Sequence, residues 1–235
     1  MVPNGFQAVP KPFQTVPRQF PSMPKPVATV PAIFPLPYLS PSYPPTLPIP
    51  MPTPAPHHPV PVLETARLWL RGYSPADLPA FLAMFQQPDF YRYLTGKPMS
   101  EEDCWSTLMR SAGHWTLRGY GFWAVEEKAT GRFIGSVGFV DRKRTIEPAI
   151  GEAPEIGWVL DAATHGRGYA TEAVRAVQAW GDAHFRGART VCLMHPDNGA
   201  SRRIAEKFGY REYARTTYHD EPAVLLERLA QPTRP

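Results

Sequence analysis

The chain has 235 residues and a formal net charge of +4, and both its prolines and its charges are unevenly distributed. Before Val62 lie 20 of the 30 prolines, three basic residues (Lys11, Arg18 and Lys25) and no acidic residue, which leaves 22 basic against 21 acidic residues in the rest of the chain. This near-neutral remainder excludes an electrostatic nucleic-acid binder, and without a run of 18 apolar residues no segment is expected to span a membrane.

Cysteine usage indicates the compartment. Cys104 and Cys192 are isolated and lack the spacing of metal ligands, so we expect free thiols in a reducing environment and no metal site. Prolines interrupt the apolar residues of the N-terminus every few positions, and no signal-peptide core remains. The chain is therefore expected to be cytoplasmic.

Residues 1–61 form a proline-rich segment of low complexity. Prolines at this density fix φ and remove backbone donors, so neither a helix nor a sheet ladder can form. The composition predicts a disordered, partly extended tail, followed by one folded domain over residues 62–235. A ligand for an aromatic-grooved partner domain is one alternative. A true start near Met51 or later is another, because the composition changes abruptly at about Val62.

The folded part is expected to begin with a strand and a helix. Within residues 64–71, Leu68 and Leu70 alternate with Trp69 and Arg71, as the two faces of a strand do. Ser74 before Pro75, with Asp77 three residues after the cap, predicts a capped helix that ends before Pro88.

A second helix is predicted after an irregular, aromatic stretch at residues 89–94. Ser100 and Asp103 mark its start as a second capping box. Apolar residues then recur at helical spacing, which indicates a face that packs on a core. The side chains expected to face inward are Trp105, Leu108, Met109 and Ala112.

The rest of the folded part combines strands and helices. Three strands follow one another without an intervening helix, which predicts an antiparallel meander, and the strand after the next helix must run nearly parallel to the third of them. The expected elements are strands at 121–126, 132–141 and 155–160, a helix at 169–185, a strand at 190–195, a helix at 200–208 and a closing hairpin at 210–217 and 223–229. They predict a mixed α/β fold, in which a mostly antiparallel sheet is flanked by helices.

A glycine-punctuated loop connects the strand at 155–160 to the helix at 169–185. Gly166 and Gly168 lack a Cβ, so the backbone can turn tightly and approach a bulky ligand. The helix N-terminus adds unpaired N–H groups and the positive end of its dipole, which together form an anion site. A dinucleotide fingerprint is disfavoured because Thr171 stands where Gly or Ala is needed and because a meander, not a first strand, precedes the loop. A Walker loop is excluded because no Gly-Lys-Ser/Thr follows. We therefore expect a phosphate-bearing cofactor.

Five segments stand in a characteristic order and spacing. They are Gly121-Phe-Trp-Ala-Val-Glu126, Gly131-Arg-Phe-Ile-Gly-Ser-Val-Gly138, Glu155-Ile-Gly-Trp-Val-Leu160, Gly166-Arg-Gly-Tyr-Ala-Thr-Glu-Ala173 and Asn198-Gly-Ala-Ser-Arg-Arg-Ile-Ala-Glu-Lys-Phe-Gly-Tyr210. With them the chain resembles the GNAT superfamily of N-acetyltransferases, and within it the branch of ribosomal-protein alanine acetyltransferases. The resemblance covers about residues 63–229 and implies the acyl-CoA N-acyltransferase fold with acetyl-CoA as the co-substrate.

The resemblance also implies a cofactor site. In the family the loop reads Arg/Gln-x-x-Gly-x-Gly/Ala and its amides hold the pyrophosphate; here Gly168 and Ala170 match, and His165 replaces the Arg or Gln. The strand at 155–160 is expected to splay from the strand at 190–195, so that pantetheine enters between them. The expected cofactor-binding residues are Trp158, Val159, Leu160, Gly166, Arg167, Gly168, Tyr169, Ala170, Thr171, Asn198 and Ser201.

Glu155 and Ser201 are the catalytic candidates on the same resemblance. Glu155 is expected to act as the base, directly or through water; a solvated carboxylate at a strand end is the alternative. Asn198 and Ser201 match the family's Asn-x-x-Ser, with Asn198 positioning pantetheine and Ser201 donating a proton to the CoA thiolate. A turn residue and a helix hydroxyl are their alternatives. Many relatives use a tyrosine for this donation, where the present chain has Ala205.

The expected function is transfer of the acetyl group of acetyl-CoA to a primary amine, directly within a ternary complex; an acyl-CoA-binding module without catalysis is the alternative. The acceptor is a small molecule or a peptide: a protein α-amine, an amino acid, a polyamine or an antibiotic. Its pocket is expected near 90–94, the 142–152 loop and the last hairpin, where Glu147 and Glu152 would suit a cationic amine. We also expect a homodimer and a partner domain that binds the tail. Binding to nucleic acid or to a membrane is not expected.

Overall fold

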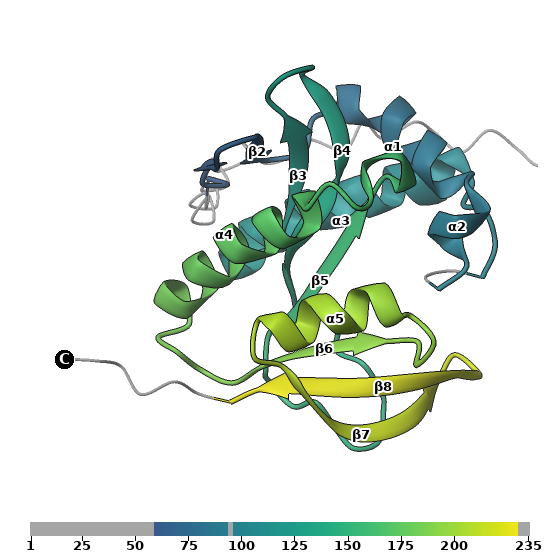
Figure 1. The fold of residues 1–235 in the computed structure, drawn as a ribbon, viewed down its shortest axis with the longest axis vertical. Coiled ribbons are helices and arrows are strands. Elements are labelled where there is room, and N and C mark those ends of the chain that lie inside the picture. Colours follow the sequence, from purple (N-terminus) through teal and green to yellow (C-terminus); the bar gives the residue numbers. More distant parts are fainter. Residues whose placement is uncertain (1–58, 94–95, 230–235) are drawn as a thin grey trace, which may run out of the picture. The chain divides into compact units, whose positions relative to one another are not determined.

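The computed structural model describes residues 59–93 and 96–229 of the chain. Of the tail expected over residues 1–61, all but the last three residues lie outside these ranges. The described residues form an eight-stranded sheet with helices on both of its faces (Figure 1). None of the helices within these ranges has both the length and the apolar character that a membrane span requires.

The element boundaries follow the sequence patterns closely, and both Ser74 and Ser100 form the expected capping boxes. The strands are β1 (Leu63–Glu64), β2 (Leu68–Arg71), β3 (Phe122–Glu127), β4 (Arg132–Val140), β5 (Glu155–Leu160), β6 (Thr190–Met194), β7 (Arg211–Tyr218) and β8 (Glu221–Arg228). The α-helices are α1 (Leu78–Phe85), α2 (Pro88–Tyr91), α3 (Glu101–Arg118), α4 (Tyr169–His184) and α5 (Gly199–Lys207).

The strands are ordered β1-β2-β3-β4-β5-β6-β8-β7 in the sheet. From β1 to β5 each strand pairs antiparallel with the next, which confirms the expected meander, and β5 pairs parallel with β6, as expected. The strand expected over residues 64–71 is broken into a small hairpin. Thr65 causes the break, because its N–H donates to Leu68 O at 3.0 Å and its hydroxyl accepts from Leu68 N at 2.9 Å.

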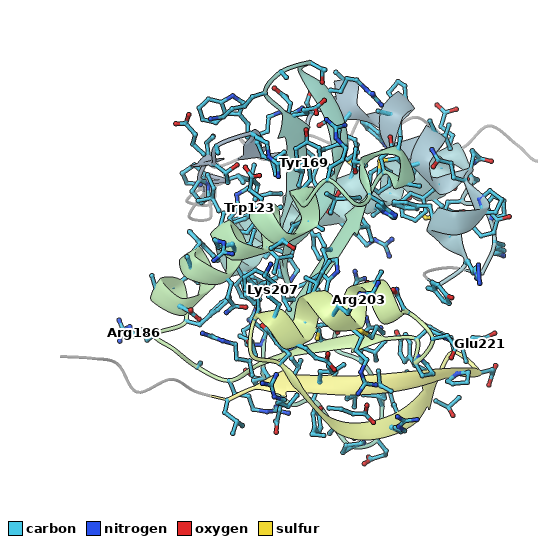
Figure 2. All side chains as sticks on the ribbon, in the orientation of Figure 1. Trp123, Tyr169, Arg186, Arg203, Lys207 and Glu221 are labelled. Carbon is cyan, nitrogen blue, oxygen red and sulfur yellow. The ribbon has the colours of Figure 1, made fainter. Side chains whose placement is uncertain are left out.

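Each face of the sheet has its own apolar core. Below α4, the buried Ala173 and Val177 pack with strand residues such as Trp123, which also contacts Trp180 edge to face at 5.0 Å (Figure 2). On the opposite face, α1 and α3 pack against alternate strand residues, of which Phe133 is one. This alternation is the pleat of a sheet buried on both faces.

Two predictions about the α1–α3 region are wrong. Residues 88–91 form the short helix α2 where an irregular stretch was expected, with Pro88 at its first position. In α3, Trp105 and Met109 are 39% and 45% exposed, and Ala112 is exposed as well. The inward face instead runs through Leu108 and its neighbours Cys104 and Trp115. Adjacent helix positions differ by about 100° around the axis. The predicted apolar face lies one residue away from the buried one, and it therefore points towards solvent.

Candidate active site

The loop before α4 presents unpaired main-chain donors. Gly166 and Gly168 have φ angles of 73° and 80°, and Gly168 is the N-cap of α4. Within the described ranges, the N–H groups from Gly166 to Ala170 donate no hydrogen bond, and the first intrahelical bond runs from Glu172 N to Gly168 O at 3.1 Å. A run of free amides at the positive end of a 16-residue helix is a site for a phosphate-type anion.

Arg67, which sequence reasoning missed, anchors this loop. Its guanidinium donates to the Arg167 carbonyl at 2.9 Å and to the Glu172 carboxylate at 2.7 Å. Thr65 also donates to Glu172, at 2.7 Å. Burial would raise the pKa of Glu172, but the hydrogen bonds from Thr65 and Arg67 outweigh it and hold this pKa below its ordinary value. The positive end of the helix dipole also stabilises a carboxylate in the first turn. Thr65 and Arg67, at the break between β1 and β2, thus hold both the loop and the first turn of α4.

The side chains of two predicted cofactor residues have structural partners. Tyr169, at the start of α4 (Figure 2), is 4% exposed and donates its hydroxyl to Glu127. Its ring contacts the guanidinium groups of both Arg67 and Arg167, at 4.3 and 4.8 Å. The hydrogen bond from Tyr169, joined by one from Thr130, lowers the pKa of Glu127. Tyr169 and Arg167 thus leave their main-chain N–H groups, rather than their side chains, to a ligand.

β5 and β6 form a gap beside the loop. Their ladder has one pair, Glu155 with Val191, and beyond it the strands diverge, which confirms the expected splay (Figure 1). The Asp161 amide donates to β4, at Ile134 O, and peptide groups alternate along a strand. Trp158 and Leu160 therefore direct their main-chain groups to the β6 side. By the same alternation, the main-chain N–H and C=O of Val159 point to β4.

Several polar groups at this gap lack a protein partner or hold a weak one. The indole Nε1 of Trp158 is buried and has no hydrogen-bond partner in the described part of the chain. The Leu160 carbonyl lies 3.1 Å from Nε2 of His165, the residue in the family's Arg/Gln position. Buried polar groups without partners are rare in native structures. A ligand that offers amide groups along β5 fits this strand, and one with a pyrophosphate fits the loop beyond it.

Asn198 and Ser201 lie where β6 leads into α5. The Asn198 side chain is the N-cap of α5 and accepts from Ser201 N at 3.1 Å. The Ser201 hydroxyl is half-buried and has no hydrogen-bond partner among the described residues. Both residues follow the carboxyl end of β6, as the Gly166 loop follows that of β5. In open α/β sheets, ligands bind outside the carboxyl ends of such strands.

Glu155 lies at the closed end of the gap, in an ion pair. Arg144 donates to both carboxylate oxygens, at 2.6 and 2.7 Å, and the Glu155 side chain is 10% exposed. Burial would lower the pKa of Arg144, but the hydrogen bonds that Arg144 donates to Glu155 outweigh it and raise this pKa. The structure therefore holds Glu155 as a paired, largely buried carboxylate, not as the solvated strand end that was the alternative.

A cavity of about 350 Å³ adjoins Glu155, under the loop between β4 and β5. Its charged lining residues are Asp141, Arg142, Lys143, Arg144, Glu152 and Glu155. Glu152, expected to favour a cationic amine, is 88% exposed and lies 3.7 Å from Lys143. Sequence reasoning missed the basic residues here, although the run from Arg142 to Arg144 directly after a strand was the available signal.

The other two segments expected around an acceptor have different neighbours. Tyr93, after α2, packs its ring on that of His195 at 5.4 Å, just beyond β6. Tyr218, at the end of β7, lies under the Arg144 guanidinium at 4.4 Å. Glu155 faces the side of the sheet on which α1 and α3 lie, because side chains alternate along β5 and Val159 packs with the α1–α3 core.

Comparison with known proteins gives the family. A model of the acetyltransferase (GNAT) domain matches residues 67–211. YkkB, an uncharacterized protein of Bacillus subtilis (strain 168), is 30% identical over 172 residues, which cover 71% of this chain and 94% of YkkB. A Bordetella pertussis structure described as a GnaT-family acetyltransferase is 32% identical, with a TM-score of 0.64 over 71% of this chain and 98% of that one.

A more distant structure shares the fold. It is that of RimL, a ribosomal L7/L12 α-N-protein acetyltransferase, in complex with coenzyme A. RimL is 19% identical, with a TM-score of 0.59, over 72% of this chain and 98% of that one. The domain match covers more than half of the chain, and the elements that it spans are those that build the loop and the gap. The chain therefore belongs to the GNAT acetyltransferase family.

Proposed function

We propose that the protein transfers the acetyl group of acetyl-CoA to a primary amine. The proposal depends on two sets of main-chain N–H groups that are free for a ligand. One set is the loop amides from Gly166 to Ala170, and the other is the amides of Trp158 and Leu160 on β5. A pyrophosphate followed by an amide-bearing arm has complementary acceptors in this order. The fold shared with RimL, whose structure holds coenzyme A, supports the same ligand.

The path along β5 has the length needed to bring a thioester to Glu155. Leu160 and Glu155 are five residues apart in an extended strand, which spans roughly 17 Å at about 3.3 Å per residue. With the pyrophosphate on the loop, the far end of the arm lies beside the β5–β6 pair. Asn198, at the carboxyl end of β6, flanks the same path, and we assign it to positioning the arm.

Two side chains are assigned to proton transfer. Acetyl-CoA supplies the activated acetyl group, and the amine nitrogen forms the new N–C bond as the C–S bond breaks. Glu155 accepts the proton that the amine loses, directly or through water, while Arg144 holds its carboxylate in place. Ser201 supplies a proton to the leaving sulfur, for which its unpaired hydroxyl is available. Positioned acid and base groups of this kind each contribute about 10²–10⁴ in rate.

A non-catalytic acyl-CoA-binding module is the second candidate. It is favoured by the ion pair that occupies Glu155 and by Ala205, which stands where many relatives have a tyrosine. Under this alternative the loop and the gap bind the same ligand, and no acetyl group leaves it.

An acceptor screen separates the two. Acetyl-CoA is incubated with the protein and a panel of amines, release of free CoA thiol is followed, and acetyl-CoA binding is measured in parallel by calorimetry. Amine-dependent thiol release supports the transferase. Binding without release for any amine supports the module, and the absence of binding overturns both. Gly168→Val, designed to close the loop to the ligand, serves as the inactive control.

A further inference from the structure

The guanidinium of Arg142 lies beside Glu155 and forms a long ion pair with its carboxylate, which Arg144 also holds. Its Nε is 3.8 Å from a Glu155 oxygen, beyond hydrogen-bond distance, and Arg144 already donates to both oxygens of that carboxylate. No other carboxylate of the described residues pairs with Arg142, whose side chain is 48% exposed at the cavity. Arg142 is therefore a cation next to the candidate base whose N–H groups have no hydrogen-bond partner in the described part of the chain.

The nearest other carboxylate, that of Asp141, does not pair with this guanidinium. Asp141 pairs with Lys143 at 2.9 Å and with Arg118 at 3.4 Å, so its charge is committed to other cations. Partial burial lowers the pKa of Arg142; Glu155 raises it, and the repulsion of Arg144 and Arg110 lowers it further, to a value below the ordinary one. The cavity lining has as many acidic as basic residues, so it is the unused donors of Arg142 that favour an anion at this end.

The separation of Glu155 and Arg142 limits the distance between the reacting amine and an anionic group bound at Arg142. A base takes a proton from a group within about 2.6–3.2 Å, and Arg142 is 3.8 Å from the same carboxylate. An amine at Glu155 and an anionic group at Arg142 consequently fit within one small molecule. The cavity, at about 350 Å³, lies at the lower end of the range for small-molecule sites.

We propose that the acceptor is a small amine that carries an anionic group, such as an amino acid, and that Arg142 binds this group. The inference rests on the proposed acetyl transfer, since it names the acceptor of that reaction. A guanidinium suits a carboxylate or a phosphate because its donors match their oxygens in pairs. Arg144 remains the partner of Glu155 and keeps the base in position, so the two arginines have different tasks.

The test compares amine acceptors that carry an anionic group with matched amines that lack it. Amino acids are paired with their carboxamides, and O-phosphoethanolamine with ethanolamine, and CoA thiol release gives kcat/KM for each. The anionic member is expected to be preferred by about tenfold or more, the scale of a charge-assisted hydrogen bond. The carboxylate and phosphate pairs show which anion the site takes. Equal or better use of the neutral members overturns the inference.

Variants then trace the preference to Arg142. Arg142→Gln should abolish it by raising KM for the anionic acceptor, and Arg142→Lys should restore part of it. Arg215→Gln is the matched control, because Arg215 pairs with Glu212 on β7 and is 68% exposed. A preference that survives Arg142→Gln contradicts the assignment.

A binding measurement separates this inference from the proposed function. N-acetylated amino acids and their carboxamides are titrated into the protein with CoA present, and neither compound needs turnover to bind. Arg142-dependent binding of the acid without any acetyl transfer would support the anion site and count against the enzyme. Transfer to neutral amines alone would support the enzyme and count against the anion site.

Discussion

The side chains at the candidate site differ in how firmly the protein holds them. Asn198 is engaged as a helix cap and Glu155 by Arg144, whereas the hydroxyl of Ser201 has no partner among the described residues. A half-buried hydroxyl at a helix start lowers stability little when it has no partner, and its proton is available for donation. Ser201 is therefore the residue at which chemistry and folding are easiest to separate.

Ser201→Ala is expected to lower kcat by about 10²-fold, the low end for a positioned proton donor. The Kd of acetyl-CoA should stay within about twofold, because the Asn198 cap uses the main-chain N–H of residue 201, which alanine retains. Steady-state kinetics and calorimetry on the same samples measure both values. Unchanged turnover would mean that water or another group protonates the sulfur.

Glu155→Gln is expected to remove the acidic limb of the pH–rate profile, since a neutral amide cannot titrate as the base. Breaking a largely buried pair destabilises a protein by about 3–5 kcal/mol, so the double variant Glu155→Gln with Arg144→Gln serves as the folded form. Arg144→Gln alone keeps the carboxylate and should keep the acidic limb. A double variant with the wild-type profile would exclude Glu155 as the base.

At this scale the sequence predicts local contacts and misses distant ones. The caps at Ser74 and Ser100 were predictable because the partner lies three residues away. Arg67 and Glu172 are 105 residues apart, and nothing in either neighbourhood points to the other. Arg142 belongs to the same class, because its free donors follow from Arg144 having taken the Glu155 carboxylate.

Helix α3 shows how a pattern can fit two faces at the scale of an element. Leu108 belongs to an apolar stripe with Cys104 and Trp115, while Trp105 and Met109 begin a second stripe one position away. Both satisfy helical periodicity. Packing against the sheet selects the first, and the sequence holds no local signal for that choice. The glycine loop, in contrast, was predictable, since a positive φ at Gly168 and a helix start leave few alternatives.

Gly168→Val is expected to weaken acetyl-CoA binding by at least about tenfold. Its φ of +80° disfavours a branched side chain, and a Cβ there would lie 3.5 Å from the Arg67 guanidinium that anchors the loop. Such backbone strain costs about 1–3 kcal/mol. Gly131→Val, at φ +67° in the β3–β4 turn with open space around it, matches the strain away from the site. Equal Kd values for the two variants would contradict the loop assignment.

The start of the folded part gives a prediction for the whole molecule. The indole N–H of Trp123, which is fully buried, donates to Pro61 O at 2.7 Å, and Val60 packs against the same core. Removal of residues 1–58 should therefore leave the melting temperature unchanged. Removal of residues 1–61 leaves the indole donor unpaired and should cost about 1–3 kcal/mol.

Thermal unfolding of the two truncations, each against the full chain, measures the difference. For a domain of this size, about 1 kcal/mol corresponds to a shift of roughly 2–4 °C. Equal melting temperatures for both truncations would mean that Pro61 contributes no net stability. A loss already at residue 58 would give the preceding segment a role in the fold.

At the same scale, the sequence predicted the meander and the parallel strand, but not that β8 would lie inside β7. The pattern was nevertheless informative. β8 contains the buried run Ala223–Leu226, whereas β7 alternates exposed and half-buried residues over much of its length. A continuous apolar run favours an interior strand, and a charged, alternating one favours an edge.

The one-pair junction of β5 and β6 has a consequence for hydrogen exchange. Amides in a central strand normally exchange with solvent deuterium slowly, because sheet bonds protect them. Those of Trp158 and Leu160 face the gap and should exchange fast in the free protein, whereas the Val159 amide between them, bonded to β4, should be protected. Acetyl-CoA should slow the first two and leave the third unchanged. The cofactor would then supply the hydrogen bonds that β5 and β6 do not make with each other.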